Sequence, residues 1–199
     1  GLPLQERKKL LKTWIEKNPS PRLGWSEIWP LKNWEDLKQQ KIIGSAEFDH
    51  EGVMIKLKKS TYTAGRPKGP WFKWKKDPNF LDAILMYAQR GHGRRSSYYS
   101  DFTFGVWKED EIVPIGKAYF GFTDAELRKL DNWVRKNTIK RFGPVREVKR
   151  ALVLEIAFDN LHTSPRHKSG IALRFPRIHR IRWDKPINEA DKLVSLLIN

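Results

Sequence analysis

Two short segments of the sequence contain the residues best suited to chemistry. Residues Glu51–Lys56 are followed by Trp71–Lys75, and both segments alternate in the manner of β-strands. On a strand, Lys73 and Lys75 project to the same side, and two ammonium groups that converge on one point require an anion. A triphosphate or an adenylate would meet that requirement. Glu51 on the neighbouring strand could carry the metal ion that bridges phosphate oxygens.

The connection between these strands supports a phosphate site. It spans residues 62–70, is rich in Gly and Pro, and contains the basic residues Arg66 and Lys68. Lys56 has the opposite parity to Glu51 in a regular strand, so it joins the site only if the strand is irregular. The alternative interpretation is that the charged residues are ordinary solvated strand positions. The spacing of both segments around the basic connection favours the phosphate site.

The composition points to a polyanionic partner. Lys and Arg number 39 against 23 Asp and Glu, which gives a formal net charge of +16 spread along the chain. Nine Trp and ten Phe add aromatic faces on which bases can stack. A basic protein without a nucleic-acid partner is the alternative. The absence of cysteine excludes disulfides and thiolate zinc sites, and we expect a cytoplasmic protein without membrane partners.

The first part of the chain predicts two helices and two strands. Hydrophobic residues at helical spacing indicate a helix over 3–17, and a second helix is expected over 34–40. Residues 20–30 are broken by Pro and Gly and are expected to hold one short strand. The strands over 51–58 and 71–75 are expected to pair as an antiparallel hairpin with a long loop.

After Asp77-Pro78 the pattern changes to repeated short strands. Thr123–Glu126 is a capping-box sequence, which predicts a helix that continues to Gly143-Pro144, and a last helix is expected over 188–197. Five strands with a helix between the third and the fourth is the order of an oligonucleotide-binding (OB) barrel. The expected strands cover residues 81–88, 101–107, 112–119, 151–158 and 171–183.

Several of these segments resemble the motifs of the ATP-dependent DNA ligases, bacterial type. Glu51–Lys56 resembles motif IV and Trp71–Lys75 resembles motif V of that family. The resemblance covers nearly everything from about residue 48 to the C-terminus. Other residues that fit the family pattern are Tyr62, Gly65 and Arg66, and then Arg166–Gly170. Leu173–Arg177 and Asp184–Pro186 resemble motif VI and its lead-in.

The resemblance implies a three-step reaction that uses ATP and Mg²⁺ to seal nicks in double-stranded DNA. A lysine takes AMP from ATP and passes it to a DNA 5′-phosphate, and a neighbouring 3′-hydroxyl then displaces it. Glu51 would bind metal and nucleotide, Lys56 would bind nucleotide, and Lys73 and Lys75 would stabilise charge on the α-phosphate. Arg177 and Lys185 would approach the leaving pyrophosphate.

Motifs of the family are missing from these residues, among them the one that contains the adenylated lysine. Ligases carry the adenylated lysine in a Lys-x-Asp-Gly sequence, and no such tetrapeptide occurs here.

The strand pattern and the resemblance together predict a mainly β fold with helices (α+β), made of two domains. Residues 1–75 would be the C-terminal segment of a nucleotidyltransferase (adenylation) domain, and residues 76–199 a five-stranded OB-fold domain with an inserted helix and a C-terminal helix. Alone, the chain is expected to bind DNA without catalysis, and its missing N-terminal half is an expected partner.

DNA contacts are expected from cations that alternate with aromatic residues. The connection over 89–99 contains such an arrangement, which suits a phosphate backbone or an unstacked base; a solvated basic loop is the alternative. Lys136, Lys140 and Arg141 allow a weaker form of the same argument. The predicted DNA-binding residues are Arg66, Lys68, Arg94, Arg95, Arg166, Lys168 and Arg174.

Two other functional classes stay open at this point. The chain could be a stand-alone nucleic-acid-binding OB module that descends from a ligase, or a related RNA ligase or capping-type nucleotidyltransferase. The second is less favoured because the patterns over 174–177 and 184–186 resemble DNA ligases specifically.

Overall fold

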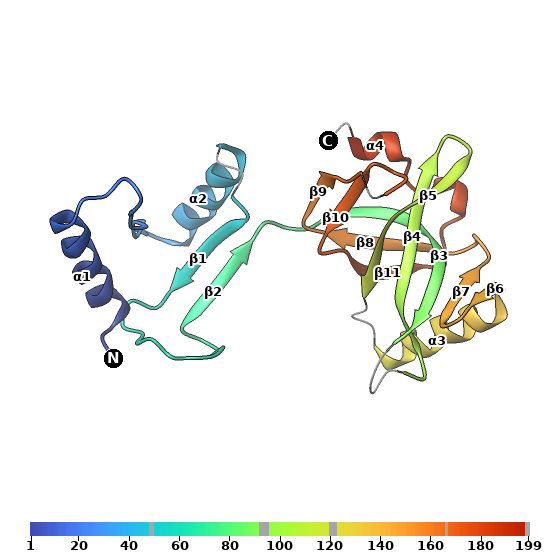
Figure 1. Ribbon diagram of the computed structural model, residues 1–199, viewed down its shortest axis with the longest axis horizontal. Coiled ribbons are helices and arrows are strands. Elements are labelled where there is room, and N and C mark those ends of the chain that lie inside the picture. Colours follow the sequence, from blue (N-terminus) through green and yellow to red (C-terminus); the bar gives the residue numbers. More distant parts are fainter. Residues whose placement is uncertain (48–49, 92–95, 120–122, 166, 198–199) are drawn as a thin grey trace. The chain divides into compact units, whose positions relative to one another are not determined.

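The computed structural model divides into two compact units, Gly1–Lys76 and Asp77–Asn199 (Figure 1). It describes the chain except for residues 48–49, 92–95, 120–122, 166 and 198–199. Within the described residues, none of the helices combines the length and the apolar character needed to cross a membrane.

The first unit contains two helices and one hairpin. Helix α1 (Leu4–Lys17) starts directly after Pro3, and its first turn is fixed by hydrogen bonds from the Leu4 and Gln5 amides to the carbonyls of Ser60 and Lys58. Helix α2 (Trp34–Glu47) is longer than expected. Strands β1 (Gly52–Lys56) and β2 (Trp71–Lys75) form the expected antiparallel hairpin.

The short strand expected over residues 20–30 does not form. This stretch is fully described and contains no strand, because it has no pairing partner and because its prolines at 21 and 30 cannot donate to a ladder.

The first unit has almost no hydrophobic core. Leu4 is the only hydrophobic side chain that is buried among those described there. Many of its large apolar residues are instead exposed: Leu2, Leu10, Leu11, Trp14, Leu23, Ile28, Trp29, Leu31, Trp34, Ile42, Ile43, Met54, Leu57, Tyr62, Trp71 and Phe72. The hydrophobic effect therefore contributes little to the stability of this unit as it stands.

The second unit is a closed five-stranded barrel. Its strands are β3 (Asn79–Arg90), β4 (Tyr99–Lys108), β5 (Glu111–Tyr119), β8 (Val153–Phe158) and β11 (Arg177–Arg182). They pair in the order β3-β4-β5-β11-β8, and β8 pairs with β3 to close the ring. The β5–β11 pair is parallel and the others are antiparallel. The expected OB fold is thereby confirmed.

The barrel interior is filled by large apolar side chains, and a helix covers it. Phe102, Phe104 and Ile115 are fully buried inside. Helix α3 (Asp124–Lys136) contributes buried Leu130 and Val134. It begins with the predicted capping box, in which the Thr123 side chain accepts from the Glu126 amide and the Glu126 carboxylate accepts from the Thr123 amide.

Helix α3 ends earlier than the sequence predicted. The expected continuation to Gly143-Pro144 is wrong, because the chain instead forms a hairpin of β6 (Thr138–Phe142) and β7 (Val145–Val148). The Asn137 side chain bonds to the Trp133 carbonyl at the helix end, and Gly143 supplies the positive φ of 54° that the turn requires. Strand β7 pairs with β3, so the hairpin extends the barrel sheet.

The last part of the chain is more broken than expected. The single strand predicted over 171–183 is two strands, β10 (Ile171–Arg174) and β11, separated by Phe175 with φ of 51° and by Pro176. Strand β10 pairs with β9 (Asn160–Thr163) outside the barrel. The expected C-terminal helix is reduced to a 3₁₀ turn, η2 (Ile187–Glu189), and helix α4 (Leu193–Leu197).

Candidate nucleotide and nucleic-acid sites

The β1–β2 hairpin brings three of the predicted lysines to one face. Directly opposed residues of an antiparallel pair share a face, and the register places Lys75 opposite Gly52, Lys73 opposite Met54 and Lys56 opposite Trp71. Lys56, Lys73 and Lys75 therefore belong to the same face. The Lys56 ammonium lies 4.6 Å from the centre of the Trp71 ring. This face offers positive charge beside an aromatic surface.

Glu51 lies one residue before β1, and regular alternation does not extend to it. Its carbonyl still accepts the Lys76 amide at 3.0 Å, but Gly52, the first residue of β1, has φ of 142°. A side chain at Gly52 would put its Cβ 2.3 Å from the Trp74 carbonyl oxygen, so this position requires glycine. Because the backbone is irregular here, parity in the sequence does not decide whether Lys56 and Glu51 share a site.

A cavity of about 380 Å³ opens between this face of the hairpin and the connection that joins its strands. Met54, Trp71 and Lys73 line it from the strands. Tyr62 and Arg66 line it from the connection. The structure thus brings Arg66 and Lys73, which the sequence placed in different predicted sites, to the walls of one cavity. An aromatic and apolar lining with two cations suits a base with a phosphate attached.

Lys68 and Glu51 take no part in the lining of this cavity. Lys68 is exposed on the connection, next to Gly69 with its φ of 104°. Among the described residues, no group of three or more His, Cys, Asp or Glu side chains is arranged to hold a metal ion. A metal at Glu51 would therefore depend on ligands from elsewhere, such as the phosphates of a nucleotide.

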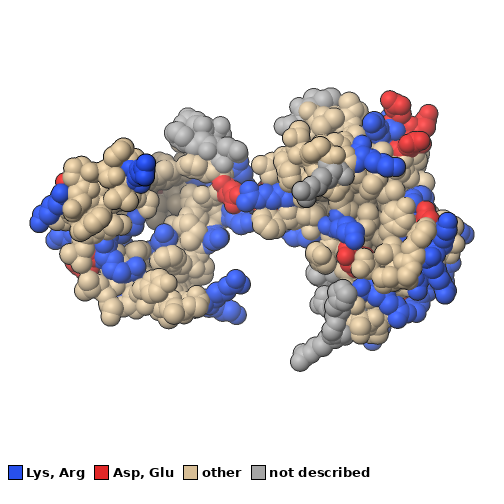
Figure 2. All heavy atoms as spheres, in the orientation of Figure 1, with Lys and Arg blue, Asp and Glu red and all other residues tan. Residues whose placement is uncertain are grey.

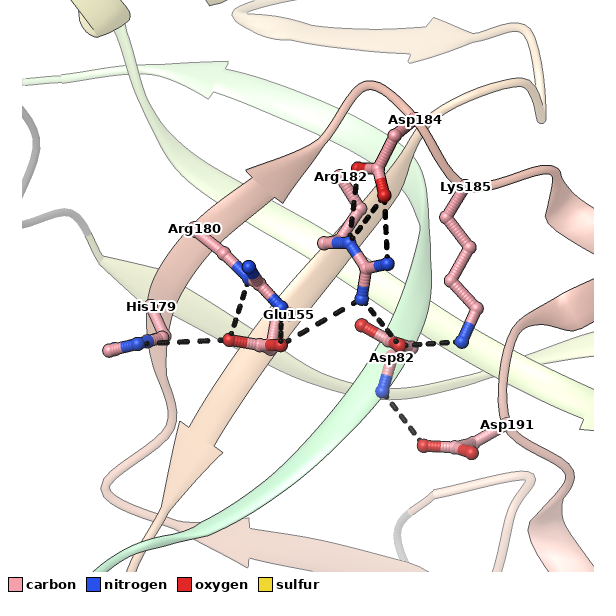
Figure 3. Close-up of polar contacts among 8 residues, drawn as sticks. All are labelled: Asp82, Glu155, His179, Arg180, Arg182, Asp184, Lys185 and Asp191. Atoms are coloured by element: carbon pink, nitrogen blue, oxygen red, sulfur yellow. Dashed lines mark hydrogen bonds and ion pairs between the residues drawn. The ribbon is translucent and has the colours of Figure 1, made fainter.

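In the OB unit, Lys185 belongs to a network of charged residues (Figure 3). Its ammonium lies 2.7 Å from Asp82 Oδ2, and the same oxygen accepts from Arg182 Nη1 at 3.3 Å. Arg182 also forms a fork with Asp184, with Nε–Oδ1 at 3.1 Å and Nη2–Oδ2 at 2.9 Å. The sequence predicted Lys185 as a site residue, but neither Asp82 nor Arg182. The alternation of Arg180, Arg182 and Asp184 along the sequence could have indicated that Arg182 lies beside Asp184.

The acidic side of this network comes from neighbouring strands. Asp82 of β3 is directly opposite Glu155 of β8, and Glu155 is opposite Arg180 of β11. The Arg180 guanidinium forms a fork with Glu155 at 3.1 and 2.9 Å. Two carboxylates directly opposite each other repel, so the cations of β11 compensate this pair.

The Arg182–Asp184 fork changes the acidity of both partners. The hydrogen bonds from Arg182 lower the pKa of Asp184 to about 2, and the bond to Asp184 raises the pKa of Arg182. The Asp184 carboxylate therefore stays ionised in moderately acidic solution, and it keeps Arg182 oriented there.

Arg177 and Lys185 lie at different ends of β11. Arg177 is the first residue of the strand, and its Nη1 donates to Asp159 Oδ1 at 3.0 Å. Lys185 follows the strand by three residues. Within this unit, the structure does not bring together the two residues that the resemblance assigned to one pyrophosphate.

The predicted DNA-binding residues of the OB unit fall into two groups. Arg94, Arg95 and Arg166 lie outside the described residues. Lys168 is exposed on the turn before β10, and Arg174 is exposed at the end of β10, 5.5 Å from the Phe175 ring centre.

A further basic surface lies over α3 and the β6–β7 hairpin. Figure 2 shows Lys and Arg side chains gathered there. Its exposed cations include Lys136, Lys140 and Arg141, and the Lys140 ammonium lies 5.1 Å from the ring centre of Phe142, which is 48% exposed. Cations next to exposed aromatic rings are a feature of nucleic-acid interfaces.

Comparison with known proteins places the chain in a family. Residues 95–185 match the family described as ATP dependent DNA ligase C terminal region. A probable DNA ligase of Koribacter versatilis is 46% identical over 212 residues, covering 96% of this chain and 37% of that protein. A DNA ligase of Methanoculleus marisnigri is 32% identical and covers 98% of this chain and 34% of that protein. The chain thus spans little more than a third of the length of these curated relatives.

The solved structures agree on the fold. A structure of a Lig E DNA ligase aligns with a TM-score of 0.65 and 19% identity, covering 92% of this chain and 59% of that one. The barrel and its inserted helix define an OB-fold protein. More particularly, the chain belongs to the ATP-dependent DNA ligase family and corresponds to its C-terminal part.

Proposed function

We propose that this chain is the C-terminal portion of a cytoplasmic ATP-dependent DNA ligase that seals nicks in double-stranded DNA. The observation that carries the proposal is the convergence of Lys56, Lys73 and Lys75 on one face of the β1–β2 hairpin, beside an aromatic-lined cavity. A ligase needs such cations, because negative charge builds up on the α-phosphate as adenylate is transferred.

In this proposal the residues of the hairpin have different roles. Lys73 and Lys75 stabilise the charge on the α-phosphate, and Lys56 adds to the positive potential of the same face. Glu51 would be the residue that holds Mg²⁺, an ion that needs only one or two protein carboxylates when phosphates are present. Bound there, Mg²⁺ would neutralise phosphate charge.

The nucleophilic lysine must come from outside these residues, because no Lys-x-Asp-Gly sequence occurs in them. The expected partner is the remaining part of a nucleotidyltransferase domain. The large exposed apolar surface of the first unit supports this expectation, since a soluble domain normally buries such residues against more protein. DNA would be bound by the exposed cations of the OB unit and of the connection over 62–70.

The proposal is tested with a chimera. The part of the Koribacter versatilis ligase that precedes the matched region is fused in front of residues 1–199, and the sealing of a nicked duplex is measured with ATP and Mg²⁺. We expect sealing by the chimera, and neither sealing nor a stable lysine–AMP adduct with the 199-residue chain alone. A labelled adduct on the chain alone would contradict the assignment of the acceptor lysine to another segment.

The second candidate is a nucleic-acid-binding module without catalysis. It is favoured by the missing Lys-x-Asp-Gly sequence. The same experiment separates the two candidates: a folded chimera that binds nicked DNA but does not seal it would support the module.

A further inference from the structure

One carboxylate oxygen in the OB unit holds two cations. Asp82 Oδ2 accepts from Lys185 Nζ at 2.7 Å and from Arg182 Nη1 at 3.3 Å (Figure 3). The second carboxylate oxygen, Asp82 Oδ1, is buried and has no hydrogen-bond partner among the described residues. An oxygen shared between an ammonium and a guanidinium is also how a phosphate oxygen is bound. Asp82 therefore occupies a position that suits a phosphate.

The two cations are held with different strength. Arg182 contacts Asp82, Glu155 and Asp184, whereas Asp82 is the one acidic partner of Lys185 within the described part of the chain. The side chain of Lys185 is only 18% exposed, so its ammonium is partly desolvated and requires an anion. Lys185 can thus exchange its one anion for another, while Arg182 stays fixed by the Asp184 fork.

We propose that Asp82 is a positioning residue that keeps Lys185 next to Arg182, and that an oxygen of a polyphosphate displaces Asp82 from the Lys185 ammonium. This inference rests on the proposed function, because the ligase resemblance is what implies that Lys185 approaches the pyrophosphate of a nucleotide. The exchange forms one charge-assisted hydrogen bond and breaks another, with no covalent change. Asp82 lowers the affinity for the polyphosphate, because its charge competes for the same cation, and it keeps the cation in place between binding events.

Tripolyphosphate is the probe, and isothermal titration calorimetry with the full 199-residue chain is the measurement. Asp82→Asn removes the competing charge and keeps the shape of the side chain. We expect it to bind tripolyphosphate about tenfold more tightly than the unmodified chain, which is the effect of one charge-assisted hydrogen bond.

Glu147→Gln is the matched control. Glu147 forms an ion pair with Arg150 at 3.0 Å in the same unit, and both partners are similarly shielded from solvent. The substitution changes the net charge by the same amount as Asp82→Asn. We expect unchanged affinity; equal gains for both variants would show a general charge effect and would overturn the exchange.

A second variant covers the case in which Asp82→Asn does not fold, which thermal unfolding would show. Lys185→Gln is expected to weaken tripolyphosphate binding about tenfold, since it removes the exchanged cation. Unchanged affinity in Lys185→Gln, or in a folded Asp82→Asn, would overturn the inference. Nick sealing by the chimera is scored separately, so a chimera that seals while these affinities stay unchanged overturns the exchange alone.

Discussion

Glycine at position 52 and the acid at position 184 show how single residues set the geometry of the two candidate sites. Gly52 permits the backbone turn that brings β1 against β2 immediately after Glu51. Asp184 orients Arg182, and through it the surroundings of Lys185. Neither residue needs to touch a ligand to be necessary for the site.

Gly52→Ala is expected to destabilise the hairpin. The new Cβ would lie 2.3 Å from the Trp74 carbonyl oxygen at a φ of 142°, so the backbone must shift. A strained position of this kind costs on the order of 1–3 kcal/mol. Limited proteolysis of the 57–70 connection should be faster in Gly52→Ala than in Gly65→Ala, whose Cβ would meet open space although its φ is also positive. Equal cleavage rates would contradict the role of close packing at Gly52.

The lowered pKa of Asp184 predicts a pH dependence of stability. The pKa of Asp184 is about 2 in the folded state, against an ordinary value of 3.8. A carboxylate with such a lowered pKa stabilises the fold at pH values above its ordinary pKa. That contribution is lost as the pH falls from about 4 towards 2. The melting temperature of Asp184→Asn should be lower than that of the unmodified chain at pH 7, and the gap should be much smaller at pH 2, where Asp184 is partly protonated in the folded state. A gap as large at pH 2 as at pH 7 would contradict the ion-pair origin.

At the scale of elements, helix α3 and the hairpin after it illustrate what a sequence pattern can predict. The capping box correctly predicted where α3 starts. Its end was predicted wrongly, because Thr138–Phe142 pairs with β7 and that pairing depends on β3, which is distant in sequence. Tertiary pairing overrides local propensity in such cases.

The predicted sites also contain some features that local sequence determines and others that depend on tertiary structure. The lysines of β2 share a face because of local alternation, which the sequence contains. Lys185 instead pairs with Asp82 of β3, which is 103 residues away in sequence. This contact depends on the order of the strands in the barrel, and no local sequence pattern predicts it. Arg66 reaches the cavity wall through the course of an irregular connection, which no periodicity predicts.

Loss of the capping box is expected to weaken the OB unit measurably. Thr123→Ala removes the side chain that accepts from the Glu126 amide at the start of α3. The free energy of unfolding should fall by about 1 kcal/mol, as for other N-cap substitutions. Urea denaturation monitored by tryptophan fluorescence measures this, with Thr61→Ala, on an exposed position of the other unit, as the control. A change below a few tenths of a kcal/mol would show that the cap is not needed.

The whole molecule combines two basic units, and among the described residues of the first unit almost no hydrophobic side chain is buried. A net charge of +16 makes binding of a polyanion depend on the release of counterions. The exposed cations are spread over both units, so no single one should dominate this effect.

Binding of the chain to nicked duplex DNA should weaken steeply with salt. If about six phosphates are contacted, the affinity should fall by on the order of a thousandfold between 50 and 200 mM salt. Fluorescence anisotropy over this range gives the slope. The double variant Lys140→Ala/Arg141→Ala should show a shallower slope if the β6–β7 surface contacts the backbone. Affinity that does not change with salt would contradict the electrostatic interpretation.

The most direct test of the central claim is nick sealing by the chimera with and without the lysines of β2. With Lys73 or Lys75 changed to Ala, sealing should fall by on the order of 10²–10³-fold, the usual loss when a group that stabilises transition-state charge is removed. Lys9→Ala, an exposed residue of α1, should leave the rate unchanged. Sealing at the unmodified rate in both β2 variants would contradict the assignment of this hairpin to adenylyl transfer.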